Sequence, residues 1–261
     1  MDEERRQPAS FPVERSPAND NDGVFIHQFL VGPWDNFVYF VGDRSTRSCM
    51  VVDPAWELSV IEQEAAKLDI SIGGILCTHS HFDHVNMVHP LVDKLDIPVY
   101  MLDKEVTWSN YRSQNLNKVK SGDTVSFGKH LGVTFLHTPG HTPGSACFSI
   151  DDSLVCGDTL FINGCGRCDF LGGDPEAMYY SLKQLREKLG VETRMYPGHN
   201  YGPVTVATLD EQLKSNPYLQ IPTLDDFVKH RMQGRRPNAP FPNIDPDWLK
   251  KVEEQHPPLP G

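Results

Sequence analysis

Short apolar runs bounded by turn residues recur along the chain after residue 23. Because each run is short and rich in β-branched or aromatic residues, we predict strands rather than helices at most of them. The predicted strands are Val24–Val31, Phe37–Val41, Cys49–Val52, Ile75–Cys77, Pro98–Met101, Val125–Phe127, Val133–His137, Ala146–Ile150, Leu154–Cys156 and Arg194–Tyr196. Several of them follow one another directly, as in a hairpin that turns at Asp151-Asp152. This order favours an α/β (α+β) sandwich of two sheets with outer helices over a doubly wound sheet.

Longer periodic segments separate some of these strands and predict helices over Glu57–Leu68, Val85–Leu95 and residues 175–189. The last of these is the clearest, because Asp174 can cap its N-terminus and Pro175 occupies the first helical position. Gly190 follows its last turn, where glycine commonly ends a helix.

Composition divides the chain into three parts. Residues 1–22 are rich in Pro, Asn, Asp and Ser and predict a disordered leader. Residues 23–203 hold all the predicted strands and form the candidate catalytic domain. Residues 204–261 predict a helical, Pro-interrupted C-terminal extension without further strands.

The charge and hydropathy of the chain exclude several functional classes. Its 24 basic and 35 acidic residues give a formal net charge of −11, which disfavours nucleic acid as a ligand. No apolar run approaches the roughly 20 residues that a transmembrane helix needs, so we expect no membrane association. The first ten residues are neither a secretory signal nor a transit peptide, and we expect a cytoplasmic protein.

Six cysteines are scattered through the chain, which is typical of free thiols in a reducing compartment. Cys165 and Cys168 form a single CxxC pair. Without a second pair or a thioredoxin-like setting, we interpret this spacing as incidental.

The unusual feature is the distribution of the 11 histidines. His79, His81, Asp83 and His84 lie within six residues, directly after the apolar run Ile75–Cys77. Residues two apart share one side of an extended segment but not of a helix, so His79 and His81 can converge on one metal ion at a strand end. A polar surface turn explains this cluster less well than metal ligation does.

Three further candidates each follow a predicted strand at a Gly-containing turn. They are His141 in TPGHTPG, Asp158 in GDTLF and His199 in YPGHNYG. Each alone is weak evidence, since such turn residues are common. Together with the histidine cluster they predict one metal centre.

The run THSHFDH (78–84), followed by TPGHTPG, GDTLF and YPGHNYG, resembles the metallo-β-lactamase superfamily in order and spacing over about residues 24–203. The resemblance implies an αββα sandwich of two mixed sheets with a metal site at one edge. It implies one ion at His79, His81 and His141, a second at Asp83, His84 and His199, and Asp158 as a bridge.

Two divalent ions at such a site can lower the pKa of a shared water and polarise a carbonyl group. Because every ligand offers nitrogen or oxygen, the set does not choose between metals. We expect two Zn²⁺ ions, with Fe²⁺ or Mn²⁺ as alternatives. Asp83 and Asp158 are the candidate catalytic residues.

Within the superfamily, the chain resembles two branches that handle glutathione-linked sulfur. Phe82 in the histidine loop and the GDTLF motif are similar to glyoxalase II, which implies hydrolysis of a thioester of a small thiol carrier by a metal-bound hydroxide. The Asp169-Phe170 pair and the run from Tyr196 to Leu219 are more similar to persulfide dioxygenases, which implies a single Fe²⁺ at His79, His141 and Asp158. A non-catalytic metal-binding module is a third hypothesis, weakened because all seven ligand positions are filled.

Two residues beside the metal positions are candidate substrate contacts. Arg167 can pair with a substrate carboxylate or hold its own loop, and Tyr201 can donate to substrate or pack against the wall of the site. The expected partner is a small thiol-linked molecule. The sequence leaves open whether the protein forms a homodimer.

Overall fold

The computed structural model describes residues 23–242, and most of its strands form two six-stranded sheets. The first sheet has the order β1-β2-β3-β4-β5-β6. Its strands are β1 (Val24–Val31), β2 (Asn36–Asp43), β3 (Ser48–Val52), β4 (Ser71–Cys77), β5 (Val99–Leu102) and β6 (Leu116–Val119). β1, β2 and β3 pair antiparallel, whereas β3 to β6 are all parallel.

The second sheet has the order β14-β13-β10-β9-β8-β7. Its strands are β7 (Thr124–Phe127), β8 (Leu131–His137), β9 (Ala146–Ile150), β10 (Ser153–Gly157), β13 (Arg194–Pro197) and β14 (Ala207–Thr208). Only the β10–β13 pair is parallel. A separate small hairpin consists of β11 (Leu160–Phe161) and β12 (Gly164–Cys165).

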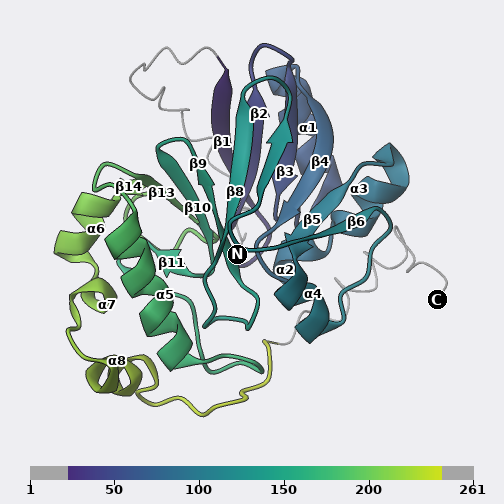
Figure 1. The fold of residues 1–261 in the computed structure, drawn as a ribbon. Helices are drawn as coiled ribbons and strands as arrows, with labels where there is room; N and C mark the ends of the chain where they lie inside the picture. Colours follow the sequence, from purple (N-terminus) through teal and green to yellow (C-terminus); the bar gives the residue numbers. More distant parts are fainter. Residues whose placement is uncertain (1–22, 243–261) are drawn as a thin grey trace, which may run out of the picture.

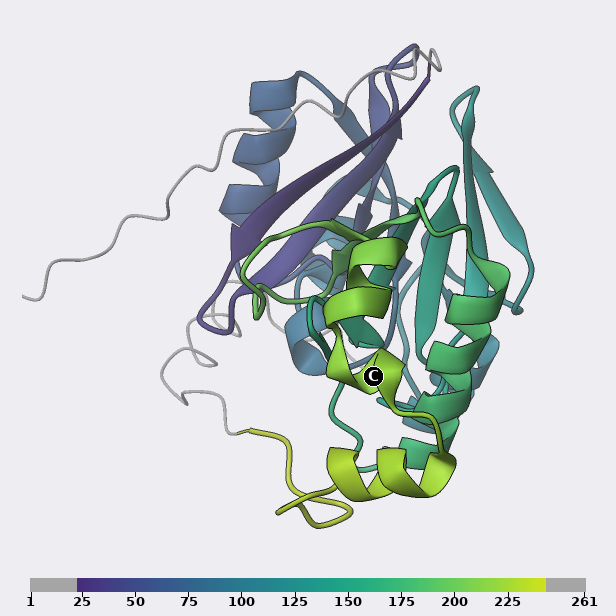
Figure 2. The ribbon, with the colours of Figure 1, turned by 90° about the vertical axis from the view of Figure 1, so that its left-hand side faces the viewer.

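Helices cover the outer faces of both sheets (Figures 1 and 2). Beside the first sheet lie α1 (Leu58–Leu68), α2 (Phe82–Val85), α3 (Val88–Leu95) and α4 (Asp103–Ser109). Beside the second lie α5 (Pro175–Lys188), α6 (Leu209–Ser215), α7 (Pro217–Gln220) and α8 (Leu224–Arg231). Figure 2 shows the two sheets between α1 on one side and α5 on the other. The predicted two-sheet sandwich with outer helices is confirmed.

Strand β2 shows why the sequence folds into these layers. Phe37, Tyr39 and Val41 belong to the apolar cluster between the two sheets, whereas Val38 and Phe40 belong to the cluster under α1 and α3. Successive side chains of a strand point to opposite faces, so the unbroken apolar run Phe37–Val41 requires cover on both. All eight residues of β2 are buried accordingly.

The structure corrects the predicted helix over Val85–Leu95, which is divided into α2 and α3. The backbone carbonyl of Asp83 accepts a hydrogen bond from the side chain of Asn36, and the amide of Met87 donates instead to Pro54. These tertiary bonds replace the helical bond that would otherwise join Met87 to Asp83.

The prediction of no strand beyond residue 204 is wrong, because β14 pairs with β13. A strand of two residues is too short to produce a periodic pattern. The structure also contains α4, β6, β11 and β12, which were not predicted. The predicted leader lies outside the described residues, and the three-part division of the chain stays a prediction. Within residues 23–242, no helix is long and apolar enough to cross a membrane.

Candidate metal centre

The predicted ligands converge because the strands that precede them end at one edge of the sandwich. β3, β4 and β5 run parallel in the first sheet, and β8 has the same direction as the parallel pair β10 and β13 in the second. The segments that follow β4, β8, β10 and β13 carry the seven predicted ligands, of which Asp83 and His84 lie in α2. Placing functional groups at the carboxyl ends of strands is common in sheets of this type.

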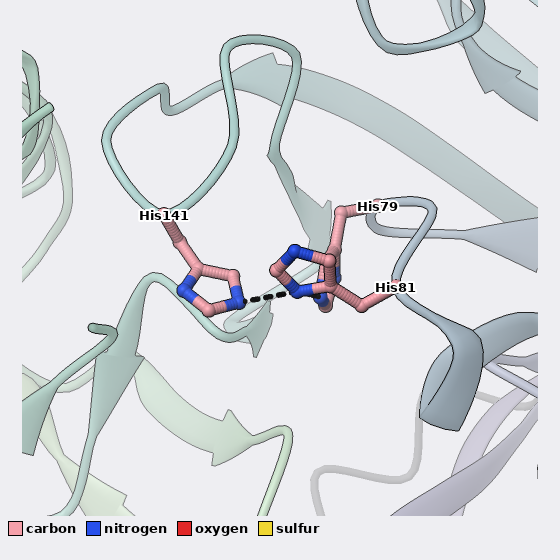
Figure 3. A group of neighbouring side chains, drawn as sticks. All are labelled: His79, His81 and His141. Atoms are coloured by element: carbon pink, nitrogen blue, oxygen red, sulfur yellow. Dashed lines mark hydrogen bonds between the residues drawn. The ribbon is translucent and has the colours of Figure 1, made fainter. Parts of the chain in front are cut away.

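Three histidines form the first group (Figure 3). Nδ1 of His81 lies 3.1 Å from Nε2 of His79 and 2.8 Å from Nε2 of His141. His79 and His141 are almost fully buried, and His81 is partly exposed. The three nitrogen atoms therefore face one point from two different loops, as the ligands of one metal ion do.

A carboxylate and two histidines form the second group. Nε2 of His199 lies 3.3 Å from Nε2 of His84 and 3.4 Å from Oδ2 of Asp83. All three side chains are buried. This group is likewise compact enough to hold one metal ion.

Asp158 lies between the two groups. Its Oδ2 is 3.4 Å from Nε2 of His141 in the first group and 3.4 Å from Nε2 of His199 in the second. Its Oδ1 is buried without a hydrogen-bond partner among the described residues, although it is 3.4 Å from Nε2 of His84. A buried carboxylate oxygen without a partner is costly, and a bound cation would compensate it.

Carbonyl groups behind two of the histidines fix their orientation. Nδ1 of His141 lies 2.7 Å from the carbonyl oxygen of Arg167, and Nδ1 of His199 lies 2.9 Å from that of Trp34. Because a carbonyl oxygen only accepts, Nδ1 carries a proton in both rings, so Nε2 is the nitrogen that would bind a metal ion at the centre. Metal-binding histidines in proteins are usually held in this way.

The carboxylate of Asp53, directly after β3, also fixes the orientation of histidine rings. Its Oδ2 accepts from Nδ1 of His84 at 3.0 Å and from the hydroxyl of Thr78 at 2.6 Å, and its Oδ1 accepts from the Thr78 amide. The Thr78 hydroxyl in turn lies 3.0 Å from Nδ1 of His79. One buried carboxylate thus orients a histidine of each group.

The surroundings of the first group favour the neutral form of its imidazoles. Burial lowers the pKa of His79, His81 and His141, and the neighbouring imidazoles lower those of His79 and His81 further. Neutral imidazole is the form that binds metal ions, so this group is ready to bind without releasing a proton.

The second group differs because carboxylates surround it. Burial acts to lower the pKa of His84, but Asp83 and Asp158 outweigh it and raise that pKa to about 10. The pKa of His199 is raised for the same reason, while that of Asp158 is held well below its usual range by His199 and His84, against burial. Metal binding here must displace protons.

Glu105, in α4, joins the two ligand loops of the first group. One carboxylate oxygen accepts from the amide and hydroxyl of Ser80 at 2.8 and 2.6 Å, and the other accepts from the Thr142 hydroxyl and the Gly144 amide at 2.7 and 3.0 Å. The side chain is fully buried. His81 and His141 therefore meet at a distance that Glu105 helps to fix.

Sequence reasoning missed Asp53 and Glu105. It placed Asn36 with Trp34 and Asp35 at the entrance of the site, whereas the structure buries Asn36 in β2, where its Nδ2 donates to Oδ2 of Asp83 at 2.9 Å. Asp53 directly follows the apolar run Cys49–Val52, the same pattern that marked His79, and could have been found by it. Glu105 lies inside a helix and had no comparable pattern.

The two predicted substrate contacts lie at the centre. The Arg167 guanidinium donates two hydrogen bonds to Asp169, at 3.0 and 2.6 Å, and lies 4.0 Å from the ring centroid of Phe170. The ring of Tyr201 stacks on that of His199 with centroids 4.7 Å apart, and 60% of Tyr201 is exposed. Their contact with a substrate stays a prediction.

The donor set fits one or two borderline divalent ions. It contains five imidazoles and two carboxylates. Hydrogen bonds from outside the centre orient several of the imidazole rings, and Oδ1 of Asp158 has no hydrogen-bond partner among the described residues. Nitrogen and oxygen donors suit zinc, iron and manganese alike. The roles of the seven residues as ligands stay predictions.

Comparison with known proteins agrees with this geometry. Residues 31–199 match the sequence profile of the Metallo-beta-lactamase superfamily. A probable polyketide biosynthesis zinc-dependent hydrolase, BaeB of Bacillus velezensis, is 36% identical over 198 residues, covering 76% of this chain and 88% of the relative.

Two other relatives carry different activities in their names. Mitochondrial persulfide dioxygenase ETHE1 of Bos taurus is 30% identical over 79% of this chain and 80% of its own. Hydroxyacylglutathione hydrolase of Shewanella halifaxensis is 34% identical over 64% of this chain and 62% of its own. The crystal structure of ETHE1 from Myxococcus xanthus superposes with a TM-score of 0.75 and 29% identity, over 89% of this chain and 100% of that one.

Proposed function

The chain belongs to the metallo-beta-lactamase superfamily, and on that premise we propose that it is a metal-dependent hydrolase that cleaves a thioester of a small thiol carrier. The reaction consumes one water molecule. It replaces the C–S bond of the thioester by a C–O bond and releases a carboxylic acid and a thiol.

The position of Asp158 carries this proposal. A single oxygen, Oδ2, lies 3.4 Å from a histidine nitrogen of each group, so Asp158 would help to hold an ion in either group. When bound, two such ions supply a hydroxide nucleophile near neutral pH and polarise the carbonyl group of the substrate. The name of the Bacillus velezensis relative supports zinc as the metal.

The protein's own groups hold and orient these components. Asp83 and Asp158 provide the negative charge that offsets two cations in a buried site. Tyr201 is exposed beside His199, so its hydroxyl can donate to the thiol carrier. Arg167 keeps part of its guanidinium exposed while Asp169 holds it, and it can contact a carboxylate of the carrier.

A second candidate function, oxidation of glutathione persulfide by one Fe²⁺, has its own support. The bovine relative is a persulfide dioxygenase, and His79, His141 and Asp158 form the arrangement of two histidines and one carboxylate typical of such iron sites. In that case, the second group would orient the first instead of holding an ion.

Replacing Asp83 by Ala distinguishes the two functions. We expect the zinc-loaded wild-type protein to bind two ions and to hydrolyse S-D-lactoylglutathione or an acyl thioester of pantetheine. The variant should bind one ion and lose at least about 100-fold in kcat. Asp225→Ala, an exposed substitution in α8, is the matched control and should change neither value.

Dioxygen uptake by the Fe²⁺-loaded protein with glutathione persulfide tests the second candidate. Stoichiometric uptake with formation of sulfite, retained by Asp83→Ala together with its iron, would contradict hydrolysis as the main activity. Bound iron without uptake would contradict the dioxygenase candidate for this substrate. Binding of metal without either reaction would support the non-catalytic hypothesis.

A further inference from the structure

Three aromatic side chains from distant parts of the chain meet beside the first metal group. The ring centroid of Phe241 lies 5.8 Å from that of Trp34 and 5.2 Å from that of Phe170. Trp34 belongs to the loop between β1 and β2, Phe170 to the loop before α5, and Phe241 to the segment that follows α8. We call these three residues the aromatic wall.

The wall directly contacts the candidate ligands. The ring of Phe241 lies 4.6 Å from that of His81, and the ring of Phe170 lies 5.9 Å from that of His81 and 6.1 Å from that of His141. His81, Trp34 and Phe241 are all partly exposed. A molecule that reaches the first group from this side therefore touches the wall.

The segment from Arg235 to Phe241 is fastened to the loop that carries Phe170. The Arg235 guanidinium lies 3.3 Å from Oδ1 of Asp169, and the Ala239 amide donates to the Asp169 carbonyl at 2.7 Å. Ala239 also forms a β-bridge with Phe170. Phe241 is consequently held at its position beside His81 by the backbone and by an ion pair.

The nearest cations do not make the wall polar. Asp169 pairs with both Arg167 and Arg235 and offsets their charge, and Cζ of Arg167 lies 4.0 Å from the ring centroid of Phe170. What remains beside His81 is largely aromatic surface, which binds apolar groups better than the peptide-like part of a thiol carrier.

We propose that the aromatic wall is the subsite for the acyl group and that it selects thioesters with an apolar acyl chain, with Phe241 as the specificity-determining residue. This inference rests on the proposed thioester hydrolysis. A hydrogen-bonding thiol carrier fits the side of the centre at Tyr201, which stacks on His199 of the second group and is exposed.

The test compares acetyl, hexanoyl and phenylacetyl thioesters of glutathione and of pantetheine on the zinc-loaded protein. We expect kcat/KM of the wild type to be at least about tenfold higher for hexanoyl than for acetyl. Phe241→Ala should remove most of this preference by raising KM for the hexanoyl ester, with kcat for the acetyl ester within about twofold. Phe241→Leu should retain it.

Tyr180→Ala, which removes an exposed aromatic side chain from α5, is the control and should keep the preference. Zinc content should be equal in all variants. A loss of equal size for every acyl group, or an unchanged preference in Phe241→Ala, would overturn the role of the wall. If Phe241→Ala does not fold, Trp34→Ala gives the same comparison.

Calorimetry with thioethers separates this inference from the proposed function. S-hexyl and S-methyl derivatives of glutathione and pantetheine cannot be hydrolysed, and the wild type should bind the hexyl forms at least about tenfold more tightly, a preference that Phe241→Ala loses. If no thioester is cleaved but this binding preference is found, the aromatic wall does bind apolar chains and the proposed hydrolysis is contradicted. If thioesters are cleaved without any chain-length preference, only the proposed role of the aromatic wall is contradicted.

Discussion

The Oδ2 atom of Asp53 lies 3.0 Å from Nδ1 of His84. The same oxygen accepts a hydrogen bond from the hydroxyl of Thr78, the residue before His79. The strand end of β3 thereby controls the ring orientation of residues that follow β4. We therefore expect the candidate metal centre to depend on a residue that no ligand motif contains.

Replacing Asp53 by Asn tests this relationship. Asp53 has a φ of +49°, a conformation that Asn also tolerates, so the backbone should be preserved. The amide accepts fewer hydrogen bonds than the carboxylate, and we expect zinc affinity to fall about 10–100-fold. Competition with a chromophoric chelator measures this. Asp96→Asn, at a similar φ of +50°, is the control, and equal affinities in all three proteins would contradict the role of Asp53.

Glu105→Gln should loosen the first group. The amide nitrogen of Gln would face donors from Ser80 or from Thr142 and Gly144, leaving buried donors without partners. We expect the free energy of unfolding to fall by about 1–3 kcal/mol and zinc affinity to fall with it. Denaturant titration and chelator competition measure the two effects. The control is Glu62→Gln, at a surface ion pair, which should change neither quantity. If Glu105→Gln also changes neither, Glu105 is not needed to position the two loops.

Gly198→Ala should displace the carboxylate of Asp158. A Cβ atom at this position would lie 2.3 Å from Oδ1 of Asp158, and the Gly157 backbone leaves no space on the other side. We expect about 1–3 kcal/mol of destabilisation and less than two bound zinc ions per chain, measured by denaturation and by elemental analysis. Gly190→Ala has open space at its Cβ and serves as control. Two zinc ions in Gly198→Ala would refute a strict requirement for the position of Asp158.

Asp43 should make the stability of the protein depend on acidic pH. Hydrogen bonds from Ser45 and from the amides of Lys129 and His130 hold its pKa well below the ordinary value of 3.8. The unfolded chain therefore binds the proton first, so this contribution is complete above about pH 4 and is lost as pH falls toward the folded pKa. The difference in unfolding free energy between wild type and Asp43→Asn should be largest at pH 6 and shrink by pH 2.5. A constant difference would contradict this origin.

The six cysteines should be unreactive in the folded protein. All of them are free and buried, and burial raises the pKa of Cys49 and of Cys168 to about 12. Since the thiolate is the reactive form, Ellman's reagent should label none within minutes in native buffer and all six in guanidinium chloride. One rapidly labelled thiol in native buffer would show that part of the chain opens easily.

The sequence by itself determined the class of the fold and the candidate ligands. Alternating apolar residues in short runs specify strands buried on one or both faces, and β1 and β9 have the predicted bounds. The seven candidate ligands were predicted because they lie in motifs that follow apolar strands and whose order resembles one superfamily. Such local patterns are visible in the residues themselves.

The tertiary structure alone decided what supports those ligands. Asn36 and Asp83 are 47 residues apart, Glu105 and Gly144 are 39 apart, and Phe241 meets His81 across most of the chain. These partners carry no periodicity, because a hydrogen bond or ring contact between loops depends on where strands end in space. Their selection follows from the order and direction of strands in two sheets, which the single sequence does not display.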